Sequence, residues 1–94
     1  MRIVGERAYL LKCVDRLLGL AGTCRIPVKG YAVMMSGGKF TAFVSLGSGT
    51  DMETVKKFCR DGQKCFRAVI LSVGSTGPDS RYPTIFIQRI PHIK

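Results

Sequence analysis

Two adjacent glycines, Gly37 and Gly38, constrain the fold of this chain more than any other feature. They join the runs YAVMM and KFTAFVSL, in which bulky apolar side chains recur at alternate positions. A two-residue Gly-Gly turn between such runs predicts a β-hairpin, because glycine accepts the positive φ that both central positions can require. The predicted cross-strand partners are Ser36 with Lys39, Met35 with Phe40, Val33 with Ala42, and Tyr31 with Val44.

Apolar side chains at three- and four-residue spacing predict one helix before this hairpin and one after it. The first helix covers residues 6 to about 20, and Gly22 is its expected stop. The second helix starts at Thr50 and ends at Gly62. Its opening TDME matches a capping box, in which the Thr50 hydroxyl accepts the Glu53 N–H and the Glu53 side chain reaches back.

Two further apolar runs, CFRAVILSV at 65–73 and YPTIFIQRI at 82–90, predict a second hairpin. The connection at 74–83 is rich in Gly and Ser and contains a proline, so we expect a flexible hairpin loop there. Residues 91–94 form the expected C-terminal tail. The segments YAVMMSGG and RAVILSVG align, as do FTAFVSL and PTIFIQR, which suggests an internal duplication.

The prediction is therefore one α+β domain spanning residues 1–94. Two helix–β-hairpin units, in the order α-β-β-α-β-β, form a four-stranded antiparallel sheet with both helices on one face. The duplication relates the two units by an approximate two-fold axis. A chain of 94 residues buries a limited core, so self-association would stabilise it.

Period-two alternation assigns side chains to the two faces of this sheet. The bulkier set is expected to meet the helices: Tyr31, Val33, Met35, Phe40, Ala42, Val44, Leu46, Val69, Leu71, Val73, Ile85 and Ile87. The open face would then carry Phe43, Phe66 and Phe86. An exposed apolar patch usually marks an interface, so this face is expected to form a homodimer, to stack on unpaired bases, or to be covered by the tail.

The charge of the chain indicates a polyanionic partner. Fifteen Lys and Arg oppose six Asp and Glu, which gives a net charge of +9. DNA, RNA, anionic lipid or an acidic protein would each be attracted. The segment KKFCRDGQKCFR concentrates five of these cations, namely Lys56, Lys57, Arg60, Lys64 and Arg67. Further phosphate contacts are expected from Lys39 at the hairpin tip, Arg81 in the second hairpin loop, and Arg89.

Several other classes of site are not expected. The four cysteines form no C-x-x-C pair and the single histidine is in the tail, so we predict buried free thiols in a reducing cytoplasm and no zinc.

The N-terminal region has no uninterrupted apolar centre, so no secretory signal and no membrane span are predicted. Asp51 and Glu53 would repel a phosphate at the GSGT turn, so no nucleotide pocket is expected there. The sequence also shows no set of acid and base residues that would suggest an enzyme or a cofactor.

The favoured function is a small basic nucleic-acid-binding protein that contacts phosphates without strong sequence specificity. No zinc-finger, RNP or helix-turn-helix signature is present to read bases, and the sequence does not separate DNA from RNA. The alternative is a small protein-binding inhibitor or adaptor, from a virus or mobile element, that docks on an acidic host protein.

Overall fold

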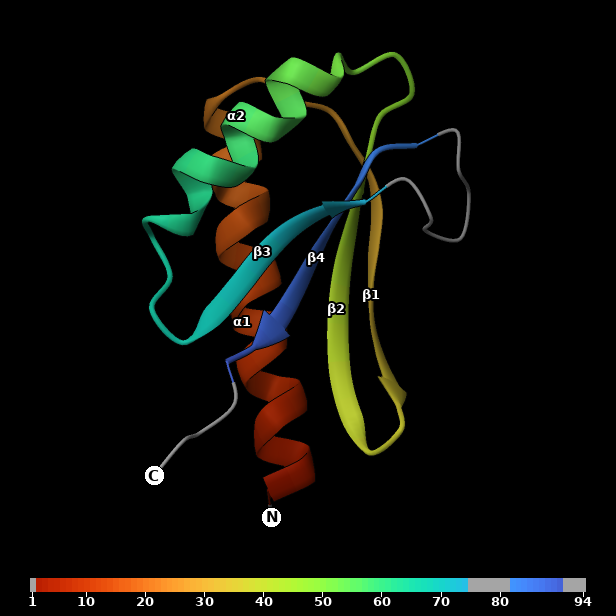
Figure 1. The fold of residues 1–94 in the computed structure, drawn as a ribbon, viewed down its shortest axis with the longest axis vertical. Helices are drawn as coiled ribbons and strands as arrows, with labels where there is room; N and C mark the ends of the chain where they lie inside the picture. Colours follow the sequence, from red (N-terminus) through yellow and green to blue (C-terminus); the bar gives the residue numbers. More distant parts are fainter. Residues whose placement is uncertain (1, 75–81, 91–94) are drawn as a thin grey trace.

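The computed structural model describes residues 2–74 and 82–90 (Figure 1). The elements follow in the order α1 (Arg2–Thr23), β1 (Val28–Ser36), β2 (Lys39–Leu46), α2 (Met52–Gln63), β3 (Val69–Gly74) and β4 (Thr84–Arg89). The strands form one antiparallel sheet in the order β1-β2-β4-β3. Both helices lie on the same side of this sheet (Figure 1). The predicted α+β fold with two helices and four antiparallel strands is confirmed, whereas the predicted loop at 74–83 and tail at 91–94 fall largely outside the described residues.

The first hairpin has the predicted turn and register. Gly37 and Gly38 have φ of 59° and 79°, as a type I′ turn requires. All four predicted cross-strand pairs are present, from Ser36 with Lys39 at the turn to Tyr31 with Val44. The register shifts once, between Val28 and Gly30, where β1 begins.

Helix α1 extends beyond the predicted range at both ends, and Gly22 lies inside it. The helix ends in a Schellman motif: the Ile26 N–H donates to the Ala21 carbonyl at 2.9 Å and the Arg25 N–H donates to Gly22 at 3.2 Å. Arg25 holds the left-handed position of this motif with φ of 60°, where glycine is the usual residue. The predicted stop was wrong because an arginine, and not Gly22, takes the turning conformation.

Helix α2 begins at Met52, and its N-cap is Asp51, which makes no side-chain cap bond. The Thr50 hydroxyl instead donates to the Gly47 carbonyl at 2.7 Å and closes the preceding turn. The predicted capping box is therefore wrong. Gly62 does not end the helix either; it is buried where a Cβ would lie 3.4 Å from Leu71 and 3.5 Å from Leu17. These are ordinary van der Waals distances, so Gly62 marks where α2 packs against both β3 and α1.

The core lies between the helices and the inward face of the sheet. The buried strand side chains on this face are Ala42, Val44, Leu46, Val69, Leu71, Ile85 and Ile87. They pack with the apolar sides of both helices, as predicted, while Val33, Phe40 and Val73 are partly buried against the same cluster. Tyr31 and Met35 share this face but are each 55% exposed. Their predicted burial was wrong, because β1 is an edge strand and α1 packs more extensively on β2.

Phe66 does not lie on the open face of the sheet. Strand β3 begins at Val69, so Phe66 belongs to the connection after α2 and its ring is buried in the core cluster. Phe43 and Phe86 do share the open face, and they are direct cross-strand partners in the centre of the sheet. The suggested repeat equates these two phenylalanines, so their facing positions are compatible with an approximate two-fold axis between them. The duplication itself remains a prediction.

Candidate functional site

Helix α2 and the connection that follows it carry the predicted basic cluster, which we define as Lys56, Lys57, Arg60, Lys64 and Arg67. All five side chains are exposed. Val55, Phe58, Cys59 and Gly62 form the buried side of α2, which leaves its basic residues on the remaining surface. Lys56 and Arg60 are four residues apart and lie on one side of the helix, and Lys64 continues that row at its C-terminal end. The structure therefore keeps this part of the predicted site together.

The cluster retains its positive charge. Two carboxylates, Glu53 and Asp61, are exposed on the same helix, so five cations oppose two anions. Within the described residues the one ion pair joins Arg89 to Glu6, and no cation of the cluster takes part in one. Arg60 and Lys64 are near the negative end of the α2 dipole, which favours cations at these positions. This surface can accept an anionic partner without breaking an existing salt bridge.

Arg16 of α1 is a further basic residue of this surface, and the sequence did not indicate it. Its Nη1 donates to the Cys65 carbonyl at 3.2 Å, and its guanidinium lies 5.9 Å from the centre of the Phe66 ring. These contacts place Arg16 beside the connection that carries Lys64 and Arg67, although Arg16 is about fifty residues distant in sequence. Only the packing of α1 against α2 and its connection brings them together, so no local pattern could have revealed it.

The remaining predicted phosphate contacts are not part of this surface. Lys39 is at the β1–β2 turn, at the opposite end of the molecule from α2 (Figure 1). Arg89 is paired with Glu6, and its guanidinium lies 4.3 Å from the centre of the Tyr9 ring. Its charge is therefore used to hold the end of β4 against α1. Arg81 lies outside the described residues.

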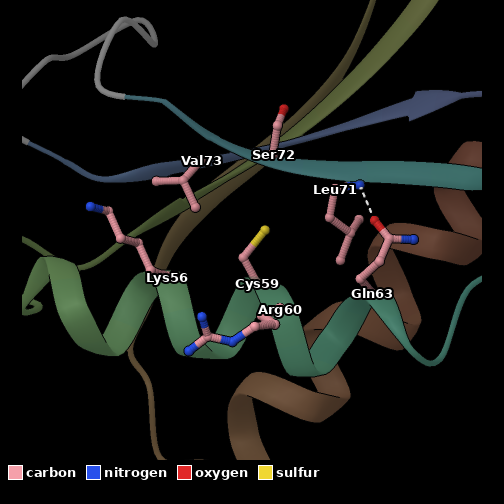
Figure 2. Close-up of a pocket in the computed structure, with 7 residues that line it drawn as sticks. All are labelled: Lys56, Cys59, Arg60, Gln63, Leu71, Ser72 and Val73. Atoms are coloured by element: carbon pink, nitrogen blue, oxygen red, sulfur yellow. Dashed lines mark hydrogen bonds between the residues drawn. The ribbon is translucent and has the colours of Figure 1, made fainter.

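A shallow pocket of about 330 Å³ separates α2 from the edge strand β3 (Figure 2). Its lining residues are Lys56, Cys59, Arg60, Gln63, Leu71, Ser72 and Val73. Cys59 points from α2 toward β3 (Figure 2). Burial raises the pKa of the Cys59 thiol, so this sulfur stays protonated at neutral pH and is a poor nucleophile. The pocket offers cations at its rim but no activated group at its base.

Gln63 is a second residue that the sequence did not single out. Its Oε1 accepts the Leu71 N–H at 2.7 Å, and its Nε2 donates to the Val69 carbonyl at 2.9 Å (Figure 2 draws the first bond). A longer contact of 3.4 Å reaches the Phe66 carbonyl. The amide thereby occupies outward-facing backbone groups of β3, which an incoming strand would otherwise use.

The open face of the sheet has two aromatic rings at its centre. The Phe43 and Phe86 ring centroids are 6.2 Å apart with an interplanar angle of 57°. Phe43 is 9% exposed, and the Phe86 ring lies over Gly74, where a Cβ would be 2.5 Å from the ring. These rings pack on each other and on the sheet, so their faces offer little area for stacking on bases.

The four cysteines divide into two buried and two exposed thiols. Cys13 and Cys59 are buried, and burial raises the pKa of the Cys13 thiol as well, although a Tyr9 hydrogen bond opposes this shift. Cys24 and Cys65 are exposed, so the expectation of buried thiols holds for Cys13 and Cys59 only. Among residues 2–74 and 82–90, no three His, Cys, Asp or Glu side chains are grouped closely enough to hold a metal ion.

Neither α1 nor α2 combines the length and apolar character needed to cross a membrane, in the range that the structure describes. Comparison with protein-family models, with curated proteins and with solved structures finds no match for this chain.

Proposed function

We propose that this protein binds nucleic acid through its phosphates, without strong sequence specificity. The observation that supports this function is the basic cluster on α2 and its connection. Its five cations are exposed and, within the described residues, free of ion pairs, and Arg16 extends the same surface. Lys and Arg side chains that neutralise phosphates release the counterions condensed on the nucleic acid, and this release drives binding.

The form of the surface favours contact with the backbone of the nucleic acid rather than with its bases. The exposed lysines carry mobile point charges and impose no fixed pattern of donors, unlike a bidentate arginine held against a base edge. The aromatic rings of the open face are packed together, so they add no stacking platform. Phosphate contacts position a protein on nucleic acid but carry no sequence information.

The test is a titration of fluorescently labelled duplex DNA, single-stranded DNA and RNA, followed by anisotropy at several salt concentrations. Six cations that each neutralise one phosphate predict a slope of log affinity against log salt of roughly −5 on duplex DNA. A triple variant, Lys57→Gln with Arg60→Gln and Lys64→Gln, should reduce the magnitude of that slope by roughly 3.

A matched control separates the cluster from net charge alone. Arg7, Lys12 and Lys39 are exposed and distant from α2 along the chain, and replacing all three by glutamine removes the same charge. The control triple variant should retain most of the affinity and the salt slope. Equal losses in both triple variants would contradict a binding surface on α2. No binding by the wild type at low salt would refute nucleic-acid binding and favour an acidic protein as the partner.

A further inference from the structure

The outer edge of β1 presents a row of backbone groups to which no described residue bonds. The two-residue turn makes Ser36 and Lys39 a hydrogen-bonded pair. Counting back from Ser36, every second residue of β1 therefore bonds to β2 through its backbone. Tyr31, Val33 and Met35 consequently direct their N–H and C=O groups away from β2. No hydrogen bond between described residues reaches these groups from the outer side. Such a row is a template for another strand.

The two edges of the sheet differ in this respect. At the β3 edge, the Gln63 amide occupies the Val69 carbonyl and the Leu71 N–H, and α2 stands beside the strand. At the β1 edge, the irregularity between Val28 and Gly30 disturbs only the start of the strand. The run from Tyr31 to Met35 contains no proline, and no side chain among residues 2–74 and 82–90 bonds to its outer edge. Natural sheets usually protect such an edge, so an unprotected one indicates a pairing surface.

Exposed apolar side chains concentrate on this same strand. Six large apolar side chains are exposed in the described residues, and three of them belong to β1: Tyr31, Met34 and Met35, each 55% exposed. Tyr31 and Met35 are on the helix side of the sheet, and Met34 is on the open side, so a partner strand would cover apolar surface on both faces.

We propose that β1 pairs with β1 of a second copy, antiparallel and centred on Val33, to form a continuous eight-stranded sheet. This register pairs Val33 with its own equivalent and Tyr31 with Met35 of the other copy. It joins all three outward-facing residues of each strand, which gives six backbone hydrogen bonds, whereas a centre at Ala32 or Met34 joins fewer. This inference does not depend on nucleic-acid binding.

The surroundings of the strand fit this occupant. A groove of about 290 Å³ lies between α1 and β1, lined by Leu11, Lys12, Val14, Asp15, Leu18 and Tyr31. Met35 of the second copy would stand opposite Tyr31 on the helix side, where this groove can take its side chain. Lys29 of each copy would face Gly37 of the other, so no two cations are directly opposed.

The exposed side chains of β1 supply part of the area that a stable dimer needs. Taking ~200 Å² for each large side chain, the three exposed residues contribute roughly 330 Å² per copy. A stable interface takes about 800 Å² per partner, so these side chains supply about two-fifths of it and the adjoining surface of β1 and α1 would have to bury the rest. Because Gln63 blocks the β3 edge, this pairing closes at two copies and does not extend into a fibre.

The test is the molar mass by size-exclusion chromatography with light scattering, at increasing concentration. The wild type should approach twice the chain mass of 10.3 kDa. Val33→Pro should return the monomer, because it removes an outward N–H and leaves the inward ladder to β2 intact. Met35→Lys should do the same through charge. Ile70→Lys is the matched control: it changes an exposed apolar residue on the open face and should leave the dimer.

Far-UV circular dichroism on each variant verifies that the fold is retained, and the two edge variants act by different means. A wild type that stays monomeric at every concentration would overturn the proposal. A dimer that survives both edge variants but dissociates in Ile70→Lys would also overturn it and would assign the interface to the open face.

Discussion

Replacing Gln63 tests whether its amide stabilises the β3 edge. Gln63→Ala removes two hydrogen bonds of 2.7 and 2.9 Å to the backbone of β3 and a weaker contact of 3.4 Å. An intramolecular hydrogen bond contributes about 0.5–1.5 kcal/mol net, so the two short bonds amount to about 1–3 kcal/mol. Water can reach the freed groups because they lie at a sheet edge, and this places the expected loss near 1–2 kcal/mol.

The measurement is thermal unfolding followed by circular dichroism. For a domain of this size, a loss of 1 kcal/mol lowers the Tm by roughly 4–8 °C, so Gln63→Ala should unfold roughly 5–15 °C below the wild type. Lys57→Ala is the matched control, because Lys57 is exposed on the same helix and both residues are good helix formers. Its Tm should change little.

Amide hydrogen exchange adds a local measurement to the thermal one. The Leu71 N–H donates to Gln63, whereas the Ile70 and Ser72 N–H groups point toward β4. In Gln63→Ala the Leu71 amide should exchange much faster, while Ile70 and Ser72 keep most of their protection. An unchanged Tm together with unchanged exchange at Leu71 would refute the role assigned to Gln63.

Two further predictions concern the end of α1 and the thiols. Arg25→Gly should stabilise the fold by about 1 kcal/mol in denaturant unfolding, because glycine relieves the left-handed strain at φ of 60°. Arg25→Ala removes the same charge but keeps the strain, so it should not stabilise the fold. Under native conditions a thiol reagent should modify Cys24 and Cys65 rapidly and the two buried thiols slowly. Burial raises the pKa of Cys13 and Cys59 above 9.0, so the folded state favours their protonated form. The resulting contribution to stability is full below about pH 9 and is lost as the pH rises beyond it. Cys59→Ala should therefore reduce the loss of stability at alkaline pH.

The fold was predictable because its main signals are local. The Gly37-Gly38 turn fixes one register, and period-two alternation then assigns Ala42, Val44 and Leu46 to the core. The same reasoning failed at the ends of elements, where the competing interaction is not visible in the sequence. The TDME pattern permits a capping box, but the Thr50 hydroxyl bonds to the preceding turn instead.

The candidate site was predictable only where it is contiguous in sequence. The cations of α2 follow one another along the chain, so their common surface follows from helical spacing. Arg16 and Arg89 depend on tertiary packing: one joins the cluster through Cys65 and Phe66, and the other is neutralised by Glu6. Net charge alone cannot separate a cation that is free to bind phosphate from one that holds the fold together.

The two proposals are geometrically compatible. Pairing at β1 leaves α2 uncovered, because β1 and β3 are opposite edges of the sheet. Directly opposed residues of antiparallel strands share a face, so the two-fold axis is perpendicular to the sheet and both α2 helices are on the same side of the dimer. The two β3 strands would be seven strand intervals apart, roughly 34 Å at ~4.8 Å per interval. Each copy of the dimer would therefore keep its own basic cluster free to contact nucleic acid.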